Sequence, residues 1–529
     1  MANSQFDLLR LTATEAARLL DEGRTTSVEL VKAYLAQINA HNHSGLKLNA
    51  LISVAPLDLL VATARKLDQE RSSGSCRSSL HSIPFVCKDV SVTHPSLGLP
   101  TTAGAPCFQS AVAKRTSPVI EHLIGMGMIL IGKANMTEFC GLKTPDHTTG
   151  WSPVGGQTQS PYVFGGLEEG EKVIGHSSLG GSSSGSASAV AAGFVPLSIG
   201  TEVCNSIVTP ASRAGLYALK CSNDAVNGAG CFGFSKHLDC IGGMAKSVED
   251  LAVLTSALMQ RESPFDLGNR RCDGFRVAFT ELEGWIWPES ACSWPGKTLS
   301  VTENGYTEAA SKLKSLGSQV TENVGIPTPW AEFEMEGENI FTEISRQSFC
   351  EGISTMNVAD YGAVFDLVND RLPAFINEFD TCEVRSLAEI VTYNEQNRDV
   401  CMPQGHEGQS DLTNLAGTLR DCAKQKALLV EMRRRGTLAL DKVLEDHDVI
   451  ASIADGPLPM YAAAAGYPIA CIPLGVVKYS DENERPYGLS LTAGMGQEGK
   501  LLRFMAAFES AFPSRPLPQS LLQWRDTCD

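Results

Sequence analysis

Hydrophobic residues recur at helical spacing near the start of the chain. Leu30, Tyr34 and Ile38 fall on one face of a helix. Threonines at positions 12 and 26 each precede a glutamate by three residues, which is the spacing of a capping box. The pattern predicts two helices joined at Gly23.

Further along, short uninterrupted apolar runs alternate with stretches of helical periodicity. Residues 119–124 predict a helix and residues 128–131 a buried strand. Other apolar runs lie at 83–87, 462–473 and 487–494, and a last helical stretch follows Gly499. Repeated alternation of this kind indicates an α/β fold.

The most distinctive run spans residues 175–220 and opens with a loop dense in glycine and serine. Such composition is usual in flexible linkers, but apolar segments flank this loop. Small residues from Ser186 to Gly193 predict a tightly packed helix, and Phe194 to Ile199 a strand. A second loop, GTEVCNS, ends at Ser206, so the chain returns beside its own serine cluster.

The composition excludes several classes of function. The 529 residues are 43% apolar and 19% charged, which is ordinary for a large globular core. A net charge of −17 argues against a nucleic-acid partner, because phosphate binding needs clustered Lys and Arg. The one dense basic run, at 433–435, is interpreted as a solvated helix face.

Targeting and metal-binding patterns were not found. The first 20 residues lack the pattern of a secretory signal, and no long uncharged apolar run predicts a membrane span. The 16 cysteines show no paired or zinc-type spacing, which favours free thiols. We therefore expect a cytoplasmic protein without metal or cofactor.

Several stretches, in order along the chain, resemble the amidase signature family of serine amidohydrolases. The catalytic ones are IPFVCKDV, GGSSSGSA and GTEVCNSI, and others are LTATEAARLL, TTAGAP, IGKANMTEF, DCIGGMAKSVEDLAVL, AAGYPIACIPLG and YGLSLTAG. The resemblance implies one large domain over residues 1–529, with a mixed sheet surrounded by helices. It also implies Ser206 as nucleophile, Ser182 as bridging serine and Lys88 as base.

The chemistry of this triad depends on a neutral lysine. A serine hydroxyl is a weak nucleophile until a base removes its proton. Lys88 follows the apolar run 83–87, where desolvation would lower its pKa. On a strand, Asp89 would point to the opposite face.

The resemblance also assigns the groups around the reacting carbonyl. Stabilisation of the oxyanion falls to the backbone N–H groups of Val203, Cys204, Asn205 and Ser206. The bridging serine of the family follows a cis peptide bond, which Gly181 in front of Ser182 would permit.

The second loop departs from the family pattern GTDxGGSIR. Here Glu202 replaces the acid, Cys204 and Asn205 replace glycines, and Val208 stands where arginine is common. Asn tolerates a positive φ better than Cys does. Arg213 is a candidate to replace the missing ion-pair partner of Glu202.

The resemblance thins between about 265 and 447, where we place a variable region that selects the substrate. Its Trp285, Trp287 and Trp294 are packing aromatics or line an acyl pocket. His176, beside the serine loop, is more simply explained as a structural residue than as a catalytic one. Neither choice is decided by the sequence.

The predicted function is hydrolysis of the C–N bond of a small-molecule carboxamide through a seryl acyl-enzyme. Three alternatives stay open: an acyltransferase or cyclising enzyme that uses the same acyl-enzyme, an inactive binding protein, and the glutamine-amidase subunit of a transamidase. A homodimer is possible.

Overall fold

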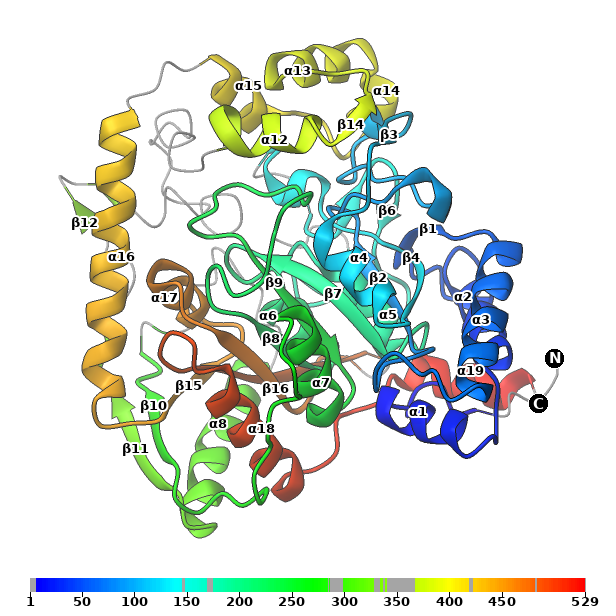
Figure 1. Ribbon diagram of the computed structural model, residues 1–529. Helices are drawn as coiled ribbons and strands as arrows, with labels where there is room; N and C mark the ends of the chain where they lie inside the picture. The colour runs from blue at the N-terminus through cyan, green and yellow to red at the C-terminus, as the bar shows by residue number, and fades with distance from the viewer. Residues whose placement is uncertain are drawn as a thin grey trace.

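The computed structural model describes residues 6–144, 148–168, 175–283, 285, 298–327, 334–335, 338–339, 367–417, 422–480 and 483–528. Within these residues, an 11-stranded mixed sheet runs through the centre of the molecule (Figure 1). From edge to edge its strands are β1 (Leu51–Val54), β4 (Ile129–Ala134), β2 (Pro84–Lys88), β7 (Leu197–Glu202), β9 (Cys240–Ala245), β8 (Tyr217–Lys220), β16 (Ile469–Lys478), β17 (Glu484–Thr492), β15 (Val449–Ile453), β10 (Arg276–Thr280) and β11 (Gln319–Val324).

The sheet combines two parallel groups with an antiparallel centre. Strands β4, β2 and β7 are parallel neighbours, and so are β15, β10 and β11. The strands between these groups pair antiparallel, as does β1 at one edge. The predicted α/β class with a mixed sheet is confirmed.

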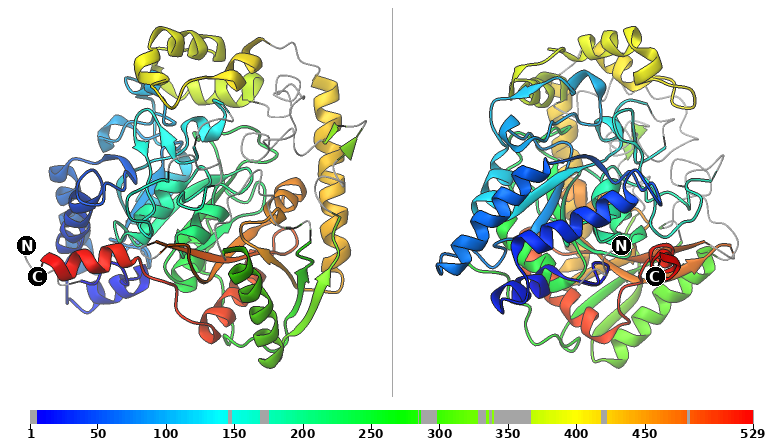
Figure 2. Two further views of the ribbon diagram at one scale, coloured as in Figure 1. Left: turned by 180° about the vertical axis from the view of Figure 1, so that it is seen from behind. Right: turned by 90° about the vertical axis from the view of Figure 1, so that its right-hand side faces the viewer.

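Helices cover both faces of the sheet (Figures 1 and 2). The helices of this part of the molecule are α1 (Ala13–Asp21), α2 (Ser27–His41), α3 (Leu57–Ser72), α4 (Pro118–Gly125), α5 (Ser184–Ala191), α6 (Val208–Arg213), α7 (Val248–Leu258), α8 (Thr298–Ser315), α16 (Cys422–Leu444), α17 (Leu458–Ala465), α18 (Glu498–Ala511) and α19 (Gln519–Cys528). Figure 2 shows the two termini close together, with α19 beside the first helices. No helix among the described residues is long and apolar enough to cross a membrane.

The two amino-terminal helices form as the sequence predicts. The Thr12 side chain caps α1 by accepting a hydrogen bond from the N–H of Glu15. Thr26 and Glu29 form the full reciprocal capping box at the start of α2. Asp250, on α7, accepts hydrogen bonds from the first N–H groups of α1, so α1 is fixed to a helix more than 200 residues away in the chain.

Helix α5 lies at the centre of the molecule and every one of its residues is buried. A Cβ at Gly185 would come within 2.4 Å of the Asn135 carbonyl oxygen and 2.5 Å of that of Ala50, so only glycine allows this approach. The predicted helix was placed two residues late. The following strand was predicted from Phe194, but β7 begins at Leu197 because a turn at Gly193, with φ of +72°, intervenes.

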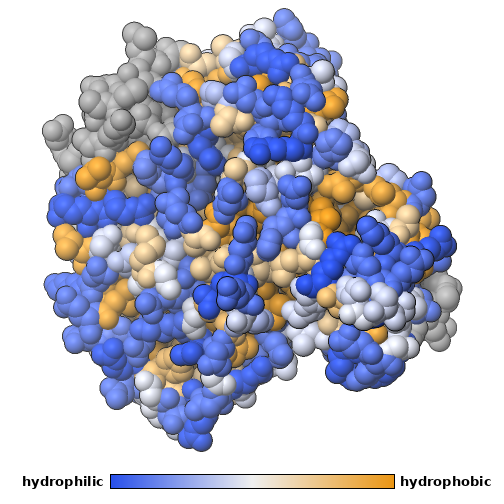
Figure 3. All heavy atoms as spheres, viewed as in Figure 1, coloured by the Kyte–Doolittle hydropathy of each residue, from blue (hydrophilic) through white to orange (hydrophobic). Residues whose placement is uncertain are grey.

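A peripheral layer is built mainly from the region that we expected to be variable. It contains α12 (Leu372–Ile376), α13 (Leu387–Gln396), α14 (Arg398–Cys401) and α15 (Ser410–Gly417), which gather at the top of Figure 1. Strand β14 (Phe379–Thr381) attaches this layer by pairing with β3 (Val112–Ala113). Figure 3 shows mostly hydrophilic side chains on this face of the molecule, with hydrophobic ones in scattered groups.

Two side-chain predictions in this region can be compared with the structure. Trp285 is a buried packing aromatic, stacked on Tyr461 with ring centroids 5.7 Å apart. Trp287 and Trp294 lie outside the described residues. The basic run on α16 is only in part a solvated face, because Arg433 is half-buried and donates a hydrogen bond to the His237 carbonyl at 2.6 Å.

Candidate active site

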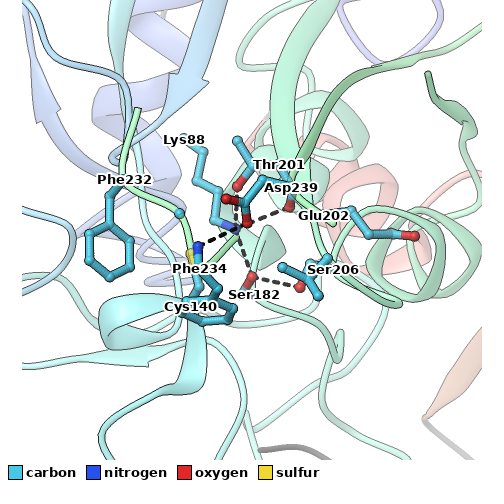
Figure 4. A pocket seen from close by; sticks show the side chains of 11 residues that line it. Lys88, Cys140, Ser182, Thr201, Glu202, Ser206, Phe232, Phe234 and Asp239 are labelled. Atoms are coloured by element: carbon cyan, nitrogen blue, oxygen red, sulfur yellow. Dashed lines mark hydrogen bonds between the residues drawn. The ribbon is translucent and has the colours of Figure 1, made fainter. Parts of the chain in front are cut away.

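The three predicted catalytic residues lie together at the ends of two neighbouring strands (Figure 4). Lys88 is the last residue of β2, which pairs in parallel with β7. Ser182 lies in the loop before α5, and Ser206 lies in the loop between β7 and α6. Lys88 and Ser182 are buried, whereas Ser206 is half-buried and borders a small pocket.

A continuous path of hydrogen bonds joins these side chains. The Nζ of Lys88 donates to the Oγ of Ser182 at 2.6 Å, and the Oγ atoms of Ser182 and Ser206 are 2.7 Å apart. Nζ also donates to the carbonyl and hydroxyl oxygens of Thr201, at 3.2 and 3.0 Å. Hydroxyl hydrogens rotate, so the same contacts can carry a proton from Ser206 toward a neutral lysine.

The surroundings of Lys88 favour the neutral amine. Burial lowers the pKa of Lys88 below its ordinary value, while negative charge on Cys140, Glu202 or Asp239 acts in the opposite direction. Asp89, as expected from strand geometry, belongs to a different environment. It forms a buried ion pair with Lys133 at 3.3 Å.

The second loop is organised by Glu202 and Asn205, two of the four residues that depart from the family pattern. The Glu202 carboxylate accepts hydrogen bonds from the N–H groups of Ile207 and Val208, at 2.5 and 2.9 Å. Asn205 has a φ of +62°, while Cys204 is not among the residues with positive φ. The residue of the pair that tolerates this conformation therefore occupies the position that requires it.

Comparison with known protein families points to the part of the chain that contains these residues. The amidase family model matches residues 29–284, which contain the whole hydrogen-bonded path. This segment belongs to the amidase family. The protein is an amidohydrolase by class, and the resemblance predicted from the motifs is confirmed.

The similarity to known proteins extends beyond the matched segment. It is 27% identical to the probable amidase of Arabidopsis thaliana, over 98% of this chain and 93% of that protein. It is 36% identical to one subunit of the glutamyl-tRNA(Gln) amidotransferase of Chloroflexus aurantiacus, over 48% of this chain and 47% of that one. The peptide amidase of Stenotrophomonas maltophilia superposes with a TM-score of 0.77 and 25% identity, over 96% and 98% of the two chains.

Two expectations about the serine loops of this amidase were wrong. Arg213 does not pair with Glu202; it forms a buried ion pair with Asp455 and donates to the carbonyls of Gly175 and Ser178. The sequence could not show this, because Asp455 is 242 residues away. The cis peptide bond expected before Ser182 is also absent, since the described peptide bonds are all trans.

The backbone N–H groups expected to form the oxyanion hole differ in their availability. Those of Val203, Cys204 and Ser206 have no hydrogen-bond partner among the residues that the structure describes. The N–H of Asn205 instead faces the Glu202 carboxylate and helps to lower its pKa, against the larger effect of burial. Three of the four predicted groups are thus without a partner in the described residues, and their assignment to an oxyanion hole stays a prediction.

Several residues around the pocket were not singled out from the sequence. Thr201, Cys140 and Asp239 line it together with the triad. A second cavity of about 260 Å³ adjoins it and shares Thr201, Phe232 and Asp239. Arg371 lines this second cavity although it lies far along the chain, in the region where the motifs thin. Thr201 and Asp239 lie in the motifs GTEVCNSI and DCIGGMAKSVEDLAVL, which offered a signal in advance, whereas nothing in the sequence pointed to Arg371.

Two remaining sequence-based predictions concern histidine and metal. The Nε2 of His176 lies 2.9 Å from a carboxylate oxygen of Glu168, and the ring packs edge-on against Tyr479. It is not among the residues that line the catalytic pocket. Across the described part of the chain, no group of three His, Cys, Asp or Glu side chains is arranged to hold a metal ion.

Proposed function

We propose that the protein hydrolyses the C–N bond of a small carboxamide through an acyl-enzyme on Ser206. The observation that carries the proposal is the path from Lys88 through Ser182 to Ser206, with contacts of 2.6 and 2.7 Å. Neutral Lys88 takes a proton from Ser182 as Ser182 takes one from Ser206, and the Ser206 oxygen attacks the carbonyl carbon.

The remaining steps use the same groups. The oxyanion of the tetrahedral intermediate accepts hydrogen bonds from the N–H groups of Val203, Cys204 and Ser206, each worth about 10²–10³ in rate. Collapse of the intermediate breaks the C–N bond, and the proton held by Lys88 returns through Ser182 to the leaving amine. Water then releases the acid from Ser206 by the reverse sequence of proton transfers.

The adjoining cavity of about 260 Å³ would hold the part of the substrate beyond the scissile amide. Its walls combine apolar residues, such as Val226 and Ile241, with the charged Asp239 and Arg371. Because Arg371 comes from the segment 265–447, we infer that this segment contributes to substrate selection within a single catalytic domain.

The proposal is tested first without a known substrate. Purified protein is treated with a fluorophosphonate, and the adduct is located by mass spectrometry. We expect Ser206 to be labelled, Ser206→Ala to remain unlabelled, and Lys88→Met to react about 10²–10⁴ times more slowly, the usual contribution of a general base. Wild-type protein that is folded but unlabelled at Ser206 would refute the proposal.

The labelling rate should also depend on pH in a defined direction. Only the neutral amine accepts a proton, so the rate rises as pH passes upward through the pKa of Lys88. Because burial lowers that pKa, the midpoint should lie below the value for an exposed lysine. Product analysis with a panel of amides, with and without a competing amine, then separates hydrolysis from acyl transfer.

A further inference from the structure

Two carboxylates that act on the catalytic lysine, Glu202 and Asp239, are each also near a second cation. Burial raises the pKa of Glu202 and of Asp239, and the charges of buried Lys220 and of Arg371, respectively, act in the opposite direction. Cys140 also acts on the pKa of Lys88 and lines the same pocket. An uncompensated carboxylate beside Lys88 would hold it as an ammonium ion, which has no lone pair to accept a proton.

Asp239 and Arg371 form a buried ion pair, in which the two groups are close without a well-aligned hydrogen bond from Nε. The Nε of Arg371 lies 3.2 Å from the Oδ2 of Asp239, and both side chains are largely buried. The carboxylate also accepts hydrogen bonds from the backbone N–H groups of Phe234 and Ser235, at 2.9 and 3.0 Å. Figure 4 shows Asp239 beside Lys88 at the pocket.

Gly233 makes room for this ion pair. A Cβ at that position would come within 2.2 Å of Asp239 Oδ2 and 2.8 Å of Arg371 Nη2. Both distances are shorter than a Cβ normally approaches a non-bonded atom, so a side chain at this position would have to displace the carboxylate or the guanidinium group.

We propose that Arg371 is a positioning residue of the active site, whose ion pair with Asp239 offsets the negative charge beside Lys88 and leaves the lysine free to act as a base. The inference rests on the proposed role of Lys88. It gives the segment 265–447 a function in catalysis besides substrate selection, because that segment supplies the cation.

The effect has a sign that a purely structural role would not produce. Replacing Arg371 by Met leaves the Asp239 charge uncompensated, which stabilises the ammonium form of Lys88 and raises its pKa. Replacing Asp239 by Asn leaves the Arg371 charge uncompensated, which has the opposite effect. The double variant removes both charges and should return Lys88 close to its original state.

The experiment measures the rate of Ser206 labelling by a fluorophosphonate from pH 5 to 10 for each folded variant. We expect the midpoint to move up by about half to one pH unit in Arg371→Met, down by a similar amount in Asp239→Asn, and back in the double variant. Arg371→Lys, which keeps the charge, should move it less than Arg371→Met. Arg503→Met, which removes an exposed cation paired with Asp266, serves as the matched control and should not move it.

The outcomes separate this inference from the proposed function. Wild-type protein that is not labelled at Ser206 would overturn both. A labelled wild type whose two single variants shift in the same direction, or do not shift, would overturn the role of Arg371 alone. Circular dichroism of each variant shows whether a loss of Ser206 labelling reflects unfolding. If Arg371→Met is unfolded, the comparison of Arg371→Lys with wild type tests the role of Arg371 instead.

Discussion

The conformation of Asn205 predicts that glycine at this position destabilises the protein less than alanine does. This residue stands where the family has glycine, and its φ is +62°. Its Oδ1 accepts a hydrogen bond from the Thr209 hydroxyl at 3.2 Å, within the first turn of α6. We compare Asn205→Ala with Asn205→Gly, since both remove that hydrogen bond and only alanine retains a Cβ.

The magnitude follows from two contributions. Loss of the hydrogen bond costs about 1 kcal/mol in either variant. Alanine also meets the penalty of left-handed backbone, roughly 1–2 kcal/mol, whereas glycine does not but loses about 0.4–1 kcal/mol through the greater freedom of its unfolded chain. We therefore expect Asn205→Ala to lower the free energy of unfolding by about 1 kcal/mol more than Asn205→Gly.

Equilibrium unfolding in urea, followed by tryptophan fluorescence, measures the difference. Where unfolding is not reversible, the rate of thermal inactivation gives the same ranking. An alanine variant as stable as the glycine variant, or more stable, would show that positive φ at this position is not a constraint on the loop.

Two further predictions concern the core, and both are measured by unfolding in urea. Lys133→Met leaves the Asp89 carboxylate buried without its cation, so we expect the free energy of unfolding to fall by about 3–5 kcal/mol. Removal of the exposed cation of Arg503 should lower it by only about 0–1 kcal/mol. Equal losses would contradict the argument. Trp285→Ala removes a buried ring and its hydrogen bond to the Ile326 carbonyl, with an expected loss of about 3–5 kcal/mol, and a loss under 1 kcal/mol would place the ring outside the core.

What the sequence predicted well was local or carried by motifs. The capping residues Thr12 and Thr26 determine where two helices begin, and each acts on residues within one turn. Lys88, Ser182 and Ser206 were named from their motifs, and the structure brings them into contact. Their catalytic roles stay predictions that the labelling experiment tests.

What the sequence could not predict depends on segments that are distant along the chain. Arg371 reaches Asp239 across 132 positions, and no periodicity or spacing links them. The same is true of Arg213, whose nearest acids in sequence suggested Glu202 while the fold supplied Asp455. In both cases several pairings were chemically equivalent, and only packing selected one.

The order of strands in the sheet shows that the segment matched by the family model is not a complete folding unit. Residues 29–284 match the family model, yet within the sheet β8 has β16 as its outer neighbour, and β10 has β15. A chain ending at residue 284 would leave β8 as an open edge and β10 detached from the rest of the sheet, and open edges promote association between chains. Arg213, which holds the serine loop by two carbonyls, would also lose Asp455. The part of the protein that carries the catalytic motifs is therefore completed by the last 80 residues or so, and shortening the chain from that end should disable the active site before it removes a single catalytic group.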